Sequence, residues 1–270
     1  MRAEEHLGNN AITVDAGDPV SSVIGKMVEA GVPEAFVFEG ETYLGAFSYP
    51  RFLKSRIDAS SAKAGNFIRR TASIQAEMDM SDVRRIIQES DLDVLPVFSD
   101  GEYSGTITVL DCMEQPEKIV KQKIDPVEHD APIREVIHRM HSGKREIPVA
   151  ENGDVTGVID HLTMLERYYL RAVPEHARRQ RSNTTRTREF EPEKKSILDL
   201  PAKNLARAVD ILPANLQAVM DAMHDAGVFM VYVRHRGEVF AVHARDLIQH
   251  EDESKGHVSF VGMSDCILDG

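Results

Sequence analysis

Two histidines three residues apart are the first groups in the sequence that could do chemistry. His138 and His141 would share one face of a helix, with Glu135 nearby, as the ligands of a metal site must. They alternate with the apolar residues Ile137 and Met140, however, and that pattern is typical of a solvated helix face. The sequence therefore predicts no metal site.

Other candidates for catalysis are weaker. Cys112 and Cys266 are too far apart to resemble a zinc knuckle or a disulfide framework. Cys112 directly follows Asp111 and could be a thiol near a ligand, although a lone cysteine is more often a small buried hydrophobe. Neither Gly-x-x-x-x-Gly-Lys-Ser/Thr nor Gly-x-Gly-x-x-Gly occurs. We expect a protein that is not an enzyme and requires no cofactor, and a cryptic enzyme is the least supported alternative.

A different pattern recurs along the chain, in which a polar side chain and a partner lie three residues apart after a short apolar run. The pairs are Thr108 with Asp111, Asp160 with Thr163 in inverted order, and His243 with Asp246. At this spacing one side chain can accept a hydrogen bond from a backbone N–H near the other, which caps the first turn of a helix.

The elements that must position these pairs form a repeated unit. Each unit has an amphipathic helix, an apolar strand, a polar turn, a second strand that opens on glycine, and another helix. The second strands begin at Gly45, Gly105 and Gly157, and at Phe240 in a weaker fourth copy. We name these copies one to four, and their predicted limits are about 10–55, 65–116, 117–170 and 196–250.

Turn and helix-start residues support this order of elements. Asp100-Gly101 and Asn152-Gly153 lie between apolar runs and predict tight hairpins. Asp18-Pro19 is predicted to occupy the N-cap and N1 positions of the first helix, and Asp130-Ala131-Pro132 leads into a later one. The predicted fold class is α+β, with a β-α-β-β-α order in each copy. One unit of about 50 residues leaves apolar surface exposed, so we expect copy one to pair with two and copy three with four.

These residues resemble the CBS-domain family, whose members pair into Bateman modules. The resemblance rests on Leu95-Pro96-Val97, on Ile147-Pro148-Val149, and above all on Gly105-x-x-Thr108-x-x-Asp111, and it covers about residues 10 to 250. It implies four CBS repeats in two Bateman modules. The expected domains are 1–116, 117–255 with an arginine-rich linker at 171–195, and a C-terminal strand and tail at 256–270, with the strand at Gly256–Gly262.

The resemblance implies an adenosine-containing ligand such as AMP, ADP, ATP or S-adenosylmethionine. The acid would accept hydrogen bonds from the ribose, while the hydroxyl and the helix N-terminus would face phosphate. Copy two has both groups, and an arginine that could reach phosphate precedes the first strand of copy three. The residues expected to contact nucleotide are Thr108 and Asp111 first, then Asp246, His243 and Arg145, and also Asp160 and Thr163. Copy one has Ser48 and Arg51 at these positions. The alternative is that these residues only cap helices and the modules only dimerise.

An arginine-rich segment interrupts the last interval between copies. Residues 171–188 contain one acid, Glu175, and six arginines, namely Arg171, Arg178, Arg179, Arg181, Arg186 and Arg188. Arginine suits bidentate contact with phosphate and stacking on bases, which points to RNA. The alternative is a solvated linker that pairs with the protein's own acidic surface.

Composition limits the partners and the compartment. With 44 acidic and 32 basic side chains, the chain has a formal charge of −12, which argues against general coating of nucleic acid or membrane. No leader and no run long enough for a membrane span is evident, so we expect a cytoplasmic protein. Our interpretation is a homodimeric regulatory protein that binds an adenosine nucleotide and modulates a partner. The alternative is a factor of the ribosome-hibernation type that contacts a ribosomal subunit or rRNA, as in some archaea.

Overall fold

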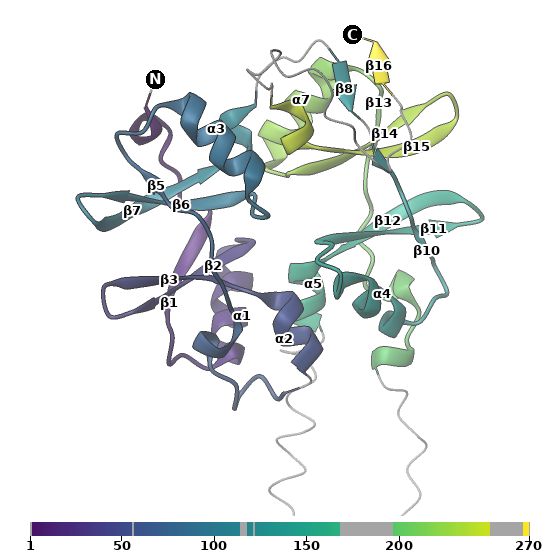
Figure 1. Cartoon of the computed structure of the whole chain (residues 1–270). Helices are drawn as coiled ribbons and strands as arrows, with labels where there is room; N and C mark the ends of the chain where they lie inside the picture. The colour runs from purple at the N-terminus through teal and green to yellow at the C-terminus, as the bar shows by residue number, and fades with distance from the viewer. Residues whose placement is uncertain are drawn as a thin grey trace, which may run out of the picture. The chain divides into compact units, whose positions relative to one another are not determined.

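The computed structural model describes residues 2–55, 57–113, 118–120, 122–167, 197–248 and 267–269. Its helices and strands follow the repeated order that the sequence predicts (Figure 1). Copy one contains β1 (Ala11–Asp15), α1 (Val20–Ala30), β2 (Glu34–Glu39), β3 (Thr42–Phe47) and α2 (Tyr49–Ser55). Copy two contains β5 (Ile74–Gln75), α3 (Met80–Glu89), β6 (Val94–Ser99), β7 (Glu102–Thr108) and the 3-10 turn η3 (Leu110–Cys112).

The second half of the chain repeats the same order. Copy three contains β10 (Val127–Glu128), α4 (Ile133–Met140), β11 (Glu146–Glu151), β12 (Asp154–Asp160) and α5 (His161–Leu165). Copy four contains β13 (Ile211–Pro213), α7 (Leu216–Ala226), β14 (Met230–His235), β15 (Glu238–His243) and the 3-10 turn η7 (Ala244–Leu247). Shorter elements precede the first strand of each copy: η1 (Ala3–His6), η2 (Ala64–Phe67), β4 (Ile68–Arg69), β8 (Lys118–Val120), β9 (Gln122–Lys123), η5 (Ile197–Asp199) and η6 (Ala202–Asn204).

Strand register shows that the four copies are equivalent position by position. In the antiparallel hairpins, Val37 lies opposite Gly45, Val97 opposite Gly105, Val149 opposite Gly157, and Val233 opposite Phe240. These are the positions that the sequence aligned. The short first strands β5, β10 and β13 run parallel to the next strand, and the helix between them makes the crossover.

The predicted turns are present, and the first helix begins one residue later than predicted. Asp100 and Gly101 have φ of 51° and 86°, and Asn152 and Gly153 have φ of 54° and 88°, which is the geometry of a two-residue hairpin turn. Helix α1 begins at Val20, so Pro19 is the N-cap residue and the predicted N-cap role of Asp18 is wrong. Asp18 instead accepts a hydrogen bond from the Lys26 ammonium at 3.0 Å.

The end of the chain contains a strand that the sequence analysis did not predict. This strand, β16 (Ile267–Asp269), lies within the segment that was expected to be an acidic tail, and it pairs antiparallel with β8. Residues 256–262, where a strand was expected, lie outside the described residues.

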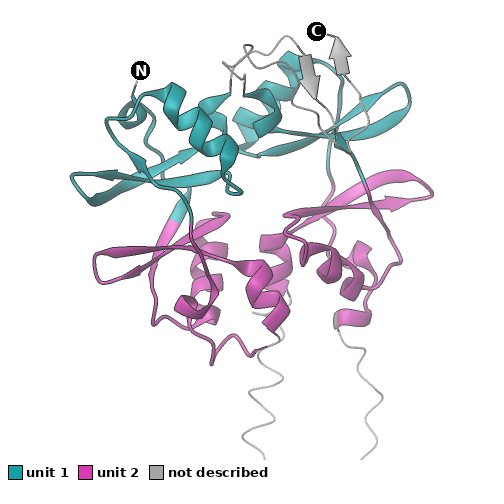
Figure 2. Ribbon diagram, in the orientation of Figure 1, with its two compact units in different colours: residues 1–11, 71–124, 209–270 teal, residues 12–70, 125–208 magenta. Residues whose placement is uncertain are grey.

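The chain forms two compact units, each of which combines alternate copies (Figure 2). Unit 1 is Met1–Ala11, Thr71–Ile124 and Val209–Gly270, and therefore holds copies two and four. Unit 2 is Ile12–Arg70 and Asp125–Ala208, and holds copies one and three. In unit 2 the two copies share one core, which includes Ile24 and Phe52 from copy one and Ile133 and Met164 from copy three. The predicted pairing of copy one with two and copy three with four joins copies from different units and stays a prediction.

The backbone that precedes the first strand of each copy pairs with the hairpin of another copy. Gly8, which precedes β1 of copy one, bridges to Thr106 of copy two, and β4, which precedes β5 of copy two, pairs with β3 of copy one. In the same way β9 pairs with β15 of copy four, and Arg207 bridges to Val158 of copy three. The exchange is therefore reciprocal between copies one and two, and between copies three and four.

This exchange explains the glycine in the second strand. The sequence analysis expected the strand to open on this glycine, but Gly45, Gly105 and Gly157 are each the fourth residue of β3, β7 and β12. A Cβ atom on Gly157 would lie 2.6 Å from the carbonyl oxygen of Arg207, and one on Gly105 would lie 3.0 Å from that of Gly8. In these copies a side chain at this position would collide with the backbone of the leading segment. Copy four has Phe240 at this position, and its leading strand β9 still pairs with β15 there.

Candidate functional site

In copy two, Thr108 and Asp111 form the expected local pair. Thr108 is the last residue of β7, and Asp111 lies within η3. The Asp111 Oδ2 atom accepts hydrogen bonds from the Thr108 backbone N–H at 2.7 Å and from the Thr108 hydroxyl at 2.6 Å. Within the described residues the other carboxylate oxygen, Oδ1, accepts no hydrogen bond. Asp111 thus caps the turn and still has an acceptor atom for a ligand.

In copy three the same residue types occur in inverted order and both carboxylate oxygens are occupied. Asp160, the N-cap residue of α5, accepts from the Thr163 N–H on Oδ1 at 2.7 Å and from the Thr163 hydroxyl on Oδ2 at 3.0 Å. The Arg207 Nε atom lies 3.1 Å from the same Oδ2. Both carboxylate oxygens of Asp160 therefore bind groups of the protein itself, as expected if this pair only caps a helix.

In copy four, as in copy two, only one carboxylate oxygen of the acid accepts hydrogen bonds from the described residues. The Asp246 Oδ2 atom accepts from the His243 N–H and from the Gln122 side-chain amide, each at 3.2 Å. Its Oδ1 atom accepts no hydrogen bond in the part of the chain that the structure describes. Burial raises the pKa of Asp246 above its ordinary value, because the charged form loses hydration.

Copy one has no carboxylate at either position of the pair. Ser48 is buried, and Arg51 donates from its guanidinium to the carbonyl oxygen of Ile68 at 2.6 Å. The carboxylates that could accept a ribose hydroxyl with an otherwise unused oxygen are thus Asp111 and Asp246, both in unit 1.

Arg145 has a partner that the sequence analysis did not anticipate. Its guanidinium forms an ion pair with Glu34, a carboxylate at the start of β2 that is 3% exposed. Its backbone carbonyl accepts from the His161 N–H at 2.8 Å. Arg145 shares unit 2 with Asp160 and Thr163, whereas Asp246, with which the sequence grouped it, lies in unit 1.

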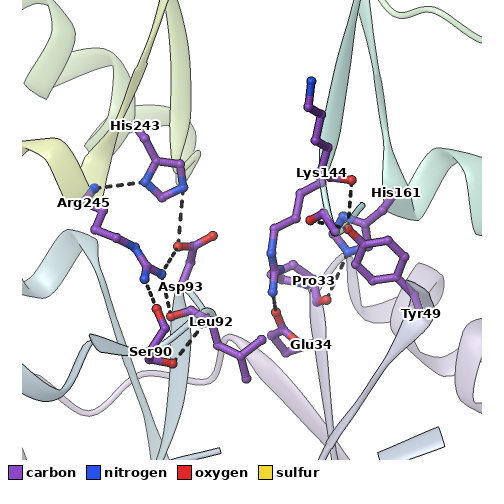
Figure 3. Close-up of polar contacts among 12 residues, drawn as sticks. Pro33, Glu34, Tyr49, Ser90, Leu92, Asp93, Lys144, His161, His243 and Arg245 are labelled. Carbon is purple, nitrogen blue, oxygen red and sulfur yellow. Dashed lines mark hydrogen bonds and ion pairs between the residues drawn. The ribbon is translucent and has the colours of Figure 1, made fainter. Parts of the chain in front are cut away.

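Unit 1 contains a corresponding ion pair, which we call the unit 1 junction: Asp93 of copy two with His243 and Arg245 of copy four. Asp93 is 2% exposed and directly precedes β6. Both basic side chains point toward its carboxylate (Figure 3): Arg245 donates to Oδ1 at 2.8 Å, and the His243 Nε2 atom lies 3.4 Å from it. Arg245 also donates to the backbone carbonyls of Ser90 and Leu92.

The unit 2 junction consists of Glu34 with Arg145, and of His161 with Tyr49 and Pro33. The rings of Tyr49 and His161 stack with centroids 4.7 Å apart, and the His161 Nε2 atom lies 3.1 Å from the carbonyl oxygen of Pro33 (Figure 3). Burial, and then the charge of Arg145, lower the pKa of His161 to about 4. This histidine is therefore neutral at physiological pH.

The sequence analysis missed Glu34, Asp93, Arg245, Tyr49 and His161. One signal was present: Glu34 and Asp93 are acids placed directly against an apolar strand, where a charge is costly to bury unless it has a partner. Their partners could not be found in this way, because Arg245 lies 152 residues from Asp93.

The other residues that the sequence analysis singled out form no further site among the described residues. The rings of His138 and His141 lie 6.2 Å apart, and no cluster of potential metal ligands occurs among the described residues. Cys112 is buried, as its commoner role predicts. Arg171, Arg178, Arg179, Arg181, Arg186 and Arg188 lie outside the described residues, so RNA contact by the linker stays a prediction. No helix among the described residues is both long and apolar enough to cross a bilayer.

Comparison with known proteins agrees with this geometry. The CBS domain family model matches residues 64–118 and 117–169, which correspond to copies two and three. A Methanocaldococcus jannaschii protein described as an archaeal homolog of γ-AMPK has a similar fold, with a TM-score of 0.70 and 13% identity over 92% of this chain and 99% of that one. An uncharacterized conserved protein of Pyrococcus horikoshii is also similar, with a TM-score of 0.54 and 14% identity over 92% and 98%. No curated protein sequence matches the chain. The predicted family resemblance and fold class are confirmed.

Proposed function

The chain is a CBS-domain protein, and from that premise we propose that its unit 1 binds an adenosine-containing ligand and that binding regulates a partner protein. One observation carries the proposal. Asp111 and Asp246 each cap a turn with one carboxylate oxygen and leave the other free of hydrogen bonds within the described residues, whereas Asp160 uses both.

An unused carboxylate oxygen beside a turn suits the vicinal hydroxyls of a ribose. Such a hydrogen bond is charge-assisted, and hydrogen bonds of that kind are the stronger ones in proteins. The description of the Methanocaldococcus jannaschii protein as a γ-AMPK homolog supports a regulatory role by similarity of fold. Under this proposal the protein acts in the cytoplasm, without catalysis, as a homodimer.

The reciprocal exchange of leading segments supports the module organisation in this proposal. Copy one supplies backbone to the copy-two hairpin and receives it from copy two, and copies three and four do the same. We therefore retain the assignment of copies one and two to one Bateman module and of copies three and four to the other.

Calorimetric titration of the full chain with AMP, ADP, ATP and S-adenosylmethionine tests the proposal. We expect Asp111→Ala to weaken binding of the best ligand by about 1.5 to 3 kcal/mol, or about 10- to 150-fold, because a charged acceptor is lost. Asp246→Ala should have a smaller effect, since copy four lacks the hydroxyl that Thr108 adds.

Asp160→Ala is the matched control, because it removes an acid at the equivalent end of a strand that has no unused oxygen. It should leave ligand affinity unchanged. The proposal is wrong if no ligand produces heat or a thermal shift, or if Asp160→Ala weakens binding as much as Asp111→Ala does.

A further inference from the structure

The two acids of the proposed function, Asp111 and Asp246, lie in different copies of unit 1. Asp111 accepts a hydrogen bond from the N–H of Thr108, the last residue of β7, at 2.7 Å. Asp246 accepts one from the N–H of His243, the last residue of β15, at 3.2 Å. Each acid therefore holds the end of its own strand, and whatever fixes that turn also fixes the acid.

On the copy-four side, two contacts connect the turn that carries Asp246 to copy two. The Arg245 guanidinium, in the turn itself, donates to the Oδ1 atom of Asp93 at 2.8 Å. The carbonyl of Ile248, the C-cap residue of the turn, accepts from the side-chain amide of Gln88 at 3.2 Å. Because these contacts hold η7 near both of its ends, the position of Asp246 depends on copy two.

The His243 ring links the same turn to Asp93 (Figure 3). Its Nδ1 atom accepts a hydrogen bond from the Arg245 backbone N–H at 3.0 Å, which places the proton of the neutral ring on Nε2. That Nε2 atom lies 3.4 Å from the Asp93 Oδ1 atom. Two side chains from the segment that carries Asp246 thus meet one carboxylate of copy two.

On the copy-two side, the backbone of Asp93 holds the turn that carries Asp111. Its carbonyl accepts from the Val109 N–H at 2.8 Å, and Val109 is the N-cap residue of η3, between Thr108 and Asp111. Asp93 is 2% exposed, and in such a packed site a displaced side chain shifts its own backbone as well. A continuous set of contacts therefore joins Asp246 to Asp111 through Asp93.

From this we infer that the unit 1 junction couples the two ligand sites, so that a ligand bound at Asp246 strengthens binding at Asp111. The inference rests on the proposed function. A first ligand that orders η7 also orders the junction and the turn at Val109, so a second ligand loses less conformational entropy when it binds. By thermodynamic linkage, a ligand at Asp111 strengthens binding at Asp246 by the same factor. Asp93 is a positioning residue in this coupling.

Calorimetric titration of the full chain with AMP tests the coupling. Asp246→Ala keeps one site, and it should bind AMP at Asp111 about 5-fold or more weakly than the wild type does. The junction variant, Asp93→Leu with Arg245→Met, removes the ion pair without leaving either charge unpaired and keeps the backbone bonds of both caps. In the junction variant, Asp246→Ala should leave AMP binding at Asp111 unchanged.

Glu34→Met with Arg145→Leu is the matched control, because it removes a buried ion pair of the same kind from unit 2. In this control Asp246→Ala should weaken AMP binding at Asp111 as it does in the wild type. The inference is overturned if Asp246→Ala has no effect on that site in the wild type, or an equal effect in the junction variant. If AMP binds at neither acid, the proposed function fails for AMP, and hydrogen exchange decides the inference.

Hydrogen exchange of the ligand-free full chain needs neither a ligand nor the junction variant. Asp246→Ala should speed exchange of the Val109 amide, which donates to the Asp93 carbonyl, by about 5-fold or more. The His161 amide donates to the Arg145 carbonyl at the corresponding place in unit 2, and its exchange should not change. Unchanged exchange at Val109 would overturn the inference, and so would equal acceleration of both amides.

Discussion

Unit 1 and unit 2 are built from the same repeat, yet they use equivalent positions differently. In unit 1 the acids Asp111 and Asp246 keep a carboxylate oxygen out of the cap. In unit 2 the acid of copy three, Asp160, lies at the position of Thr108 and is fully hydrogen-bonded, and copy one has Ser48 and Arg51 at the two positions of the pair.

The junctions differ in a related way. His243 of unit 1 is partly exposed beside a carboxylate, whereas His161 of unit 2 is buried under Tyr49 and held neutral. The comparison indicates that the same strands and turns can present two kinds of cap acid. In a receptive cap one carboxylate oxygen accepts no hydrogen bond from the described residues, and in a closed cap both oxygens accept hydrogen bonds. The number of neighbouring donors that bind the carboxylate decides which kind is present.

The largest expected effect concerns the buried ion pair of unit 2. Arg145→Leu should lower the free energy of unfolding by about 3 to 5 kcal/mol, because the Glu34 carboxylate then stays buried without the guanidinium of Arg145. Chemical denaturation measures the loss.

Two further variants sharpen that result. Adding Glu34→Met to Arg145→Leu should recover most of the stability, since the buried carboxylate is then removed together with the guanidinium that pairs with it. Arg85→Leu, which breaks an exposed pair with Asp82, should cost less than about 1 kcal/mol. Equal losses for Arg145→Leu and Arg85→Leu would contradict the importance of burial here.

The next effect is the pH dependence that His161 gives to unit 2. The pKa of His161 is about 4 in the fold, against 6.5 ordinarily, so between these values the unfolded chain binds more protons than the folded one. The free energy of unfolding should therefore fall as pH drops from about 6.5 to about 4, by up to about 3 kcal/mol.

Denaturation at a series of pH values tests this dependence. His161→Gln keeps a donor toward Pro33 but cannot titrate, so its stability should fall less steeply with acid. His224→Gln, on an exposed part of α7, should follow the wild type. A parallel pH dependence in His161→Gln and the wild type would remove His161 as the cause.

The smallest expected effect is a change in the free energy of unfolding that has opposite signs for the two kinds of cap. Because burial raises the pKa of Asp246, its charged form destabilises the fold at pH values above that pKa, and the penalty disappears as pH falls through it. Asp246→Asn should therefore raise the free energy of unfolding at neutral pH, on the order of 0.5 to 1 kcal/mol.

Asp160→Asn should act in the opposite direction, because the amide loses the ion pair with Arg207 and one acceptor oxygen. Denaturation of the two variants at neutral pH gives both signs. A stability gain in both, or a loss in both, would contradict the distinction between a receptive and a closed cap.

Much of the local structure could be predicted because it depends on residues close in sequence. Asp100-Gly101 and Asn152-Gly153 adopt positive φ in the expected hairpins. Thr108 with Asp111 and Asp160 with Thr163 form their predicted pairs, since a spacing of three brings them together at the start of a turn.

The sequence by itself determined the repeat, its elements and the four positions at which a cap acid could occur, because these follow from patterns within about ten residues. Only the tertiary structure decided which acids keep an unused oxygen and which arginine meets which buried carboxylate. Those outcomes depend on donors such as Arg207 for Asp160 and Arg245 for Asp93, which the fold brings from another copy. Charge alone does not identify a partner, since 32 basic side chains could pair with any of 44 acidic ones until packing buries a few of them together.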